Sequence, residues 1–431
     1  MKTKTFIYAL GPFLFLFIST GVEAQILNKI ANKVQETTER KVLDKTEKST
    51  EDALDGSEKK VNTTKNKKNN SKEDSLITAG PDESNVGSAD LISYANYDFV
   101  PGDQLLYYYD MAGERDSEIP GRMLLDEGNL EIQTYKGEKV LYIPASSEAY
   151  FSPQMTDKNY LPEQFTLEFD ILSNGGLKTT TDASEITLFF RGEDESVGAY
   201  GNATAPIRIV LSGISGDNDT ASYQFGIFKS DDWIGAVNKN FPAEAVNPSQ
   251  NNWRKVAFYM NKNIGKLYLD QHRIGMANQI ETGKPAKLDI AVTNPDHPVM
   301  IKNFRIAAGG ADAYNKIMSD GKIVAYGIQF DVNKATLKPE SMGTINEMVK
   351  MMQSNPALKF EITGHTDSDG KDALNIQLSQ DRAEAVKTQM ILMGIESARL
   401  TANGFGSKNP VAKNDTAENK ARNRRVEFVK L

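Results

Sequence analysis

The fold of the C-terminal part of the chain is decided by residues 359–394, which are KFEITGHTDSDGKDALNIQLSQDRAEAVKTQMILMG. Residues 359–363 predict a short strand, and the run from His365 to Gly370 contains Thr-Asp and Asp-Gly pairs typical of a turn. Residues 371–394 predict a helix of about six turns, ended by a glycine. Its expected apolar arc consists of Leu374, Leu378, Ala385, Val386 and Met393.

Polar side chains in this stretch predict a binding site. Asp367 follows the strand, where open α/β sheets bind ligands, and the next helix offers unpaired backbone N–H groups. Asn375 and Arg382 are seven residues apart, so they point within about 20° of each other, inside the apolar arc. A carboxylate and a guanidinium together suit a zwitterionic ligand. The alternative is an internal ion pair of Arg382 with Asp367 or Asp369.

Residues 321–431 resemble the OmpA-like C-terminal domain, whose members hold outer envelope proteins onto the cell wall. The resemblance rests on six elements that occur in the family's order. They are Phe330-Asp331, GHTD with SDG at 364–370, the N-x-x-L-S-x-x-R-A pattern at 375–383, Gly404-Phe405-Gly406, Asn409-Pro410, and NRRVEF at 423–428. The resemblance covers about a quarter of the chain and implies a mixed sheet in residues 318–431, with helices on one face.

The resemblance also implies non-covalent capture of diaminopimelate in the stem peptide of peptidoglycan. In that arrangement Asp367 pairs with the ligand's ammonium, and Arg382 holds its carboxylate by a forked contact. The expected ligand-binding residues are Phe330, Asp331, Asp367, Asn375, Leu378, Arg382 and Arg425. Arg425 has a second interpretation, because Arg422, Arg424 and Arg425 also suit a solvated basic patch.

Turnover is not predicted for this module. It contains no nucleophile–base arrangement and no phosphate-cradling loop, so we expect binding without catalytic residues or a cofactor. The chain has three histidines, and none has metal-ligand spacing. We therefore expect a structural role for His365 and no metal.

The N-terminus predicts export. Lys2 and Lys4 precede an apolar run, and small residues suit cleavage after Ala24, so residues 1–24 are expected to be a secretory signal peptide. Cysteine is absent, which excludes disulfides and a lipidated cysteine. The net charge of -8 argues against nucleic-acid binding. We expect a periplasmic protein, with association with the outer membrane, directly or through a partner, as the alternative.

Two segments between the signal and the first domain differ in composition. Residues 25–54 carry apolar side chains at four-residue spacing among charged ones, which predicts a thin amphipathic helical stalk. Residues 55–93 are rich in Lys, Asn, Ser, Thr and Asp, and such a composition predicts a disordered linker. Whether the helix contacts a membrane, and which oligomer forms, are not determined by the sequence.

Residues 94–310 predict a β-sandwich of short strands separated by Gly, Asn, Asp and Pro clusters. Residues 165–171 alternate apolar and polar side chains, as a half-buried antiparallel strand does. Later strands at 253–260, 265–270 and 301–306 resemble concanavalin-like or laminin-G-like jelly rolls. Such sandwiches often bind glycans, and the candidate stacking rings, which equally suit the core, are Tyr107, Tyr108, Tyr109 and Trp233.

The main hypothesis is that the C-terminal domain anchors to the cell wall a sandwich that recognises a glycan or a protein. Two other functions are considered beside it. Some jelly rolls are retaining glycosidases with Glu-x-Asp-x-x-Glu on one strand, and Glu168 and Asp170 match the first two positions. The third position is Ser173, which cannot protonate a leaving group. The remaining alternative is an assembly component whose sandwich docks an envelope protein. The acidic run at 193–195 suits Ca²⁺, although surface acidic loops are common.

Overall fold

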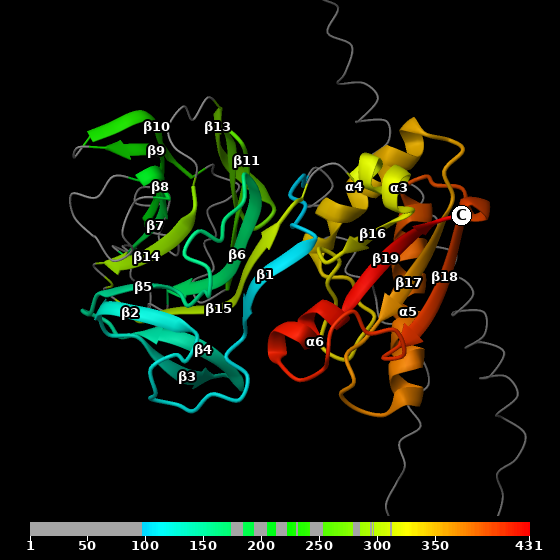
Figure 1. Cartoon of the computed structure of the whole chain (residues 1–431), viewed down its shortest axis with the longest axis horizontal. Coiled ribbons are helices and arrows are strands. Elements are labelled where there is room, and N and C mark those ends of the chain that lie inside the picture. Colours follow the sequence, from blue (N-terminus) through cyan, green and yellow to red (C-terminus); the bar gives the residue numbers. More distant parts are fainter. Residues whose placement is uncertain are drawn as a thin grey trace, which may run out of the picture. The chain divides into compact units, whose positions relative to one another are not determined.

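The computed structural model describes residues 97–173, 184–193, 205–212, 222–229, 232–241, 253–278, 285–293, 295, 297–310 and 313–431 (Figure 1). These residues belong to one compact unit, Ser84–Leu431. The predicted signal peptide, stalk and linker lie outside the described residues. Among the described helices, none is long and apolar enough to cross a membrane.

The first part of the described chain forms two antiparallel sheets. Sheet A has eight strands in the order β13-β12-β11-β6-β15-β4-β3, with β1 also paired to β15. Its strands are β1 Gln104–Tyr109, β3 Glu131–Tyr135, β4 Glu138–Ile143, β6 Gln164–Ser173, β11 Arg254–Asn261, β12 Ile264–Leu269, β13 His272–Asn278 and β15 Val299–Ala308. The predicted strands at 253–260, 265–270 and 301–306 correspond to β11, β12 and β15.

Sheet B has seven strands in the order β10-β9-β8-β7-β14-β5-β2. They are β2 Met123–Gly128, β5 Ala149–Pro153, β7 Glu185–Arg191, β8 Ala205–Ser212, β9 Ser222–Lys229, β10 Asp232–Asn240 and β14 Lys287–Thr293. One apolar core joins side chains of both sheets, for example Phe165 and Phe258 of sheet A with Phe190 of sheet B. This arrangement is the predicted two-sheet sandwich.

Strand β6 confirms the predicted alternation but corrects the expected exposure. Phe165, Leu167 and Phe169 enter the core between the sheets. The opposite face was expected to meet solvent, yet Thr166 is fully buried and Glu168 is 2% exposed. The Thr166 hydroxyl accepts a hydrogen bond from Gly102 N at 2.9 Å. The outer face of sheet A is therefore covered and polar.

The C-terminal part contains a four-stranded mixed sheet in the order β16-β19-β17-β18 (Figure 1). Strands β17 and β18 are parallel, and β19 is antiparallel to both β16 and β17. The elements are α3 Ala313–Asp320, β16 Lys322–Ala325, the 3-10 helix Pro339–Ser341, α4 Met342–Ser354, β17 Phe360–His365, α5 Asp372–Leu392, the 3-10 helix Ser397–Arg399, β18 Leu400–Gly406, α6 Ala417–Asn423 and β19 Arg425–Lys430.

This order confirms the strand–helix alternation expected from the sequence. Side chains of α4 and α5 share one core with Phe360, Ile362 and Phe428 of the sheet. The first strand, β16, is short and ends at Ala325. The chain then forms a small hairpin in which Phe330 bridges to Leu337.

Helix α5 begins and ends close to the predicted limits, and Gly394 has the positive φ of +97° expected after a helix. The predicted apolar arc is partly wrong, because Leu374 is 66% exposed. Val386 of the predicted arc is buried, and the other buried residues of the helix are Asn375, Ser379, Ala383 and Met390. Close packing on the sheet selects this face over the more apolar one.

Two glycines permit this close packing. A Cβ on Gly364 of β17 would overlap the carbonyl oxygen of Ser379, and one on Gly404 of β18 would overlap the backbone of Gln380. Two side chains of α5 also form hydrogen bonds with backbone N–H groups of β18. Ser379 Oγ accepts from Gly406 N at 2.8 Å, and Gln380 Oε1 accepts from Gly404 N at 2.7 Å.

The segment that leads into β1 packs with the C-terminal core. Tyr97 and Phe99 are 2% exposed and join a cluster with side chains of α4 and with Tyr268 of β12. Asn346 of α4 donates a hydrogen bond to the Tyr97 carbonyl at 3.0 Å. The sandwich and the C-terminal sheet therefore share buried contacts within this unit.

We expect Gly404→Ala to lower the free energy of unfolding by about 1–3 kcal/mol, because the added methyl group overpacks the α5–β18 contact. The midpoint of urea unfolding, followed by far-ultraviolet circular dichroism, measures the change. Gly121→Ala is the control, since the nearest atom to its added Cβ lies 3.5 Å away. Equal losses in both variants would contradict the close-packing argument.

Candidate functional site

The candidate site is a groove of about 540 Å³ next to the C-terminal end of β17 and the first residues of β19. Six of the seven residues expected from the resemblance line this groove. The seventh, Asp331, accepts a hydrogen bond from the groove residue Arg382 through its backbone carbonyl. Sandwich side chains line it as well, including Tyr108, Glu168, Lys255 and Arg305. The groove therefore combines the predicted site with the outer face of sheet A.

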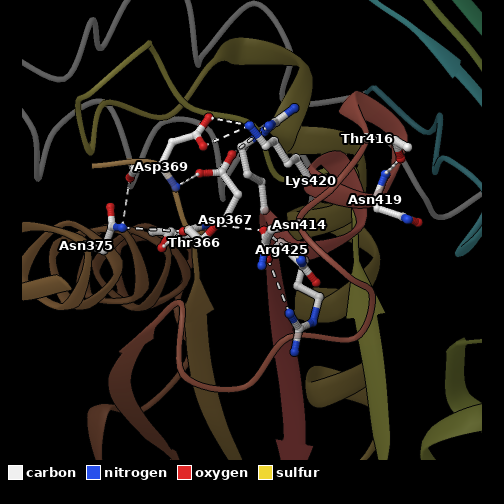
Figure 2. Close-up of polar contacts among 12 residues, drawn as sticks. Thr366, Asp367, Asp369, Asn375, Asn414, Thr416, Asn419, Lys420 and Arg425 are labelled. Carbon is white, nitrogen blue, oxygen red and sulfur yellow. Dashed lines mark hydrogen bonds and ion pairs between the residues drawn. The ribbon is translucent and has the colours of Figure 1, made fainter. Parts of the chain in front are cut away.

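Asp367 lies in the turn that follows β17, as predicted. One carboxylate oxygen accepts a hydrogen bond from Asp369 N at 3.1 Å. The other accepts from Arg424 Nη1 at 2.7 Å in an ion pair. The adjacent Asp369 pairs with Lys420 of α6 at 2.8 Å (Figure 2). Both carboxylates of the turn are thus bonded to cations near the C-terminus.

Asn375 fixes the turn from the first turn of α5. Its side-chain amide donates to the carbonyl of Asp369 at 2.9 Å and to that of Asp367 at 3.4 Å (Figure 2). Both donated bonds go to backbone carbonyls, so the position of the Asp367 carboxylate depends on this amide. Leu378 is half-buried one turn further along the same groove wall.

Arg382 lies across the groove on α5 and bonds to the hairpin that follows β16. Its Nε donates to the Lys334 carbonyl at 2.9 Å and its Nη2 to the Asp331 carbonyl at 3.4 Å. The guanidinium carbon lies 5.0 Å from the centre of the Phe330 ring. Among the ion pairs of the described residues, none includes Arg382. The alternative of an internal pair with Asp367 or Asp369 is therefore wrong.

Charges around Arg382 and Asp367 interact across the groove. Burial lowers the pKa of the Arg382 guanidinium, and the positive charge of Arg424 lowers it further. The carboxylate of Asp367 acts in the opposite direction. An anion near Arg382 would therefore meet a favourable local charge, whereas the Asp367 carboxylate is already paired with Arg424.

Arg425 lines the groove but is only 5% exposed. Its guanidinium pairs with Glu427 at 2.6 Å and donates to the carbonyls of Asn423 and Asn409. The alternative of a solvated basic patch is wrong for this residue. In Figure 2 its side chain points away from Asp367 and Asp369.

The sequence did not identify the role of Arg424. Its adjacency to Arg425 in NRRVEF placed it among the candidate basic residues, but only the fold brings it to Asp367. The sequence analysis named Tyr108 and Glu168 only as candidates within the sandwich and did not place them with Asp367. No local pattern could have done so, because these residues are distant in sequence from Asp367.

The carboxylates of the glycosidase alternative also face this groove. Glu168 accepts from Arg305 Nη1 at 2.5 Å and pairs with Lys255 Nζ at 3.5 Å. Asp170 accepts from Asn303 Nδ2 at 2.6 Å. Glu168 thus forms ion pairs with two cations, Arg305 and Lys255. Within the described ranges, no three His, Cys, Asp or Glu side chains cluster as metal ligands, and most of the acidic run at 193–195 lies outside those ranges.

The three candidate glycan-stacking tyrosines point to opposite faces of β1, because successive side chains of a strand alternate. Tyr107 is fully buried and Tyr109 is 3% exposed, so both belong to the core between the sheets. Tyr108 points to the other face of β1 and lines the groove. The side chain of Trp233 lies outside the described residues. Tyr107 and Tyr109 therefore pack in the core, as the alternative use of these rings required, and Tyr108 is the one of the three tyrosines that lines the groove.

His365 is held inside the domain, in agreement with the structural role expected from sequence. Its Nε2 lies 3.1 Å from Thr363 Oγ1, and its ring stacks on Phe405 with centroids 5.5 Å apart. Burial lowers the pKa of His365 to about 4, and the positive charge of Arg425 contributes to the shift. The ring is neutral at pH 7.

We expect acid to destabilise the protein through His365. The unfolded chain takes up a proton near pH 6.5 and the folded protein only near pH 4, so stability present above 6.5 is lost as pH falls toward 4. His365→Gln should reduce this slope by up to about 1.4 kcal/mol per pH unit. Urea unfolding at several pH values measures it, with His297→Gln as the control. Identical slopes in wild type and His365→Gln would contradict the assignment.

Comparison with known proteins places residues 329–424 in the OmpA family. The probable lipoprotein YiaD of Escherichia coli (strain K12) is 41% identical over 102 residues, which are 24% of this chain and 47% of that protein. Outer membrane porin F of Pseudomonas fluorescens is 44% identical over 100 residues, covering 23% and 31% of the two chains. The peptidoglycan-binding protein ArfA of Mycobacterium tuberculosis (strain H37Rv) is 35% identical over 102 residues, covering 24% and 31%.

Solved structures match a similar share of this chain. The peptidoglycan-associated lipoprotein from Burkholderia pseudomallei is 29% identical, with 24% of this chain and 88% of that chain covered and a TM-score of 0.23. The chain spans less than half the length of the curated relatives named above. These relatives are named as envelope or peptidoglycan-binding proteins, not as enzymes. The C-terminal part of this chain is an OmpA family domain.

Proposed function

We propose that the C-terminal domain binds peptidoglycan non-covalently through the diaminopimelate of its stem peptide, and so holds the sandwich at the cell wall in the periplasm. The observation that carries the proposal is the opposite charge of Asp367 and Arg382 in one groove, where Arg382 bonds only to carbonyl oxygens. The OmpA family match and the similarity to ArfA, a protein named for peptidoglycan binding, support it.

The chemistry of the ligand fits this pair of charges. In a stem peptide, the free end of diaminopimelate carries an ammonium and a carboxylate on one carbon. Asp367 receives the ammonium, and the planar guanidinium of Arg382 holds the carboxylate through two N–H groups. The Arg382 bonds to backbone carbonyls fix the guanidinium in place before the ligand arrives.

The remaining groove residues support this contact in the proposal. Asn375 holds the turn that presents Asp367, while Leu378 and Phe330 provide apolar surface for the methylene chain of the ligand. The hairpin backbone at Asp331 orients Arg382. Arg425 supports the groove wall, because its N–H groups bond to Glu427 and to the Asn409 carbonyl.

The sandwich is the recognition part of the same proposal, with a glycan or a second envelope protein as its partner. Wall binding then fixes the position of the sandwich without chemical change. The ion pairs of Glu168 with Arg305 and Lys255 favour binding over glycoside hydrolysis, because a general acid has to be free to give up a proton.

We expect Arg382→Ala to reduce binding to cell-wall sacculi that contain diaminopimelate. Loss of the charged hydrogen bonds costs about 1.5–3 kcal/mol, which is roughly a ten- to hundredfold weaker Kd. Co-sedimentation of the full chain with purified sacculi, over a range of sacculus concentrations, measures it. Asp367→Asn should weaken binding in the same direction.

Lys387→Ala is the matched control, because Lys387 lies on the same helix and pairs with Glu384. It removes the same charge without touching the groove, so binding should remain that of wild type. Circular dichroism checks that each variant is folded. The proposal is overturned if wild type stays in the supernatant, or if folded Arg382→Ala and Lys387→Ala bind equally well.

A further inference from the structure

The binding carboxylate of the groove already has a cation. Arg424 Nη1 lies 2.7 Å from Asp367 Oδ2, and both side chains line the groove. The Arg424 side chain is 38% exposed and that of Asp367 is 12% exposed, so the pair is partly shielded from water. Arg424 was not among the residues expected to contact the ligand.

Arg424 is held in this position from two sides. It follows α6 directly, and Arg422 of that helix donates to the Leu105 carbonyl of β1 at 3.0 Å. Glu418 of α6 pairs with Arg122 of the sandwich at 2.9 Å. The Tyr108 side chain, also on β1, lines the same groove as Arg424. The sandwich strand β1 therefore supports the guanidinium that occupies Asp367.

The occupied carboxylate affects ligands of different charge differently. A plain ammonium that approaches Asp367 either displaces Arg424 or sits beside it, and in both cases a positive charge is left without its partner. Arg382 lines the same groove and adds a second guanidinium, and the positive charge of Arg424 lowers the Arg382 pKa. A lone cation is therefore poorly matched to this end of the groove.

An ammonium with its own carboxylate avoids this cost. Its ammonium replaces Arg424 on Asp367, while its carboxylate remains next to the two guanidinium groups. With such a ligand bound, Asp367 keeps a positive partner and the guanidinium groups gain a negative one. A lysine side chain would supply only the positive partner. The distinction corresponds to the third residue of a stem peptide, where diaminopimelate presents such a zwitterion and lysine presents only an ammonium.

We infer that Arg424 is a specificity-determining residue of this groove, which excludes stem peptides ending in a plain ammonium by occupying Asp367 and admits those that carry an ammonium and a carboxylate together. This inference rests on the proposed function and deepens it. Arg382 attracts the correct ligand, and Arg424 discriminates against the incorrect one.

The test compares two synthetic tripeptides, L-alanyl-γ-D-glutamyl-meso-diaminopimelate and its L-lysine counterpart. Isothermal titration of the full chain gives the ratio of their Kd values. We expect wild type to favour the diaminopimelate peptide at least tenfold. Arg424→Gln should reduce that ratio about fivefold or more, mainly because the lysine peptide binds more tightly. Arg424→Lys restores the cation and should keep the wild-type ratio.

Lys408→Gln is the charge-matched control, since Lys408 is exposed and does not line the groove. The inference is overturned if folded Arg424→Gln keeps the wild-type ratio, or if its affinity for the lysine peptide falls. Failure of the proposed function looks different, because wild type and Arg424→Gln would then bind neither peptide. A lower ratio in Lys408→Gln would also overturn the inference, because net charge alone would explain the effect.

Discussion

The close contact between helix α5 and strands β17 and β18 is the constraint on which the site depends. Gly364 and Gly404 leave room for the helix backbone, and Ser379 bonds to the strand end through its hydroxyl group. The first turn of the helix therefore lies beside the turn that follows β17. Asn375 can then hold the carbonyls of that turn, and Arg382 reaches the hairpin on the other side of the groove.

The groove contains many charges, and several of them are paired inside the protein. Asp369 pairs with Lys420, and Arg425 with Glu427. Burial of charged groups is costly unless each has a partner, which explains these pairs. Arg382 differs, because neutral carbonyl oxygens satisfy its donors without cancelling its charge. An unbalanced guanidinium opposite a carboxylate is the electrostatic feature that an anionic or zwitterionic ligand can use.

The sandwich is part of this environment. The outer face of sheet A is covered and carries Glu168, Lys255 and Arg305 in one ion-pair group that lines the groove. Strand β1 supports α6 through the Leu105 carbonyl. Whatever the sandwich recognises, its own residues lie next to the groove of the OmpA family domain. The two parts therefore influence each other through short contacts.

Sequence alone determined the strand–turn–helix unit and the places of Asp367, Asn375 and Arg382 within it, because turn chemistry, helical periodicity and motif spacing are local. It predicted the wrong buried face for α5, since apolarity favours Leu374 whereas close packing on glycines favours Ser379 and Ala383. Only the tertiary structure decided which cation holds Asp367 and that sheet A lines the groove. Those outcomes depend on contacts between segments far apart in the chain, and no local pattern encodes which of several charges will meet.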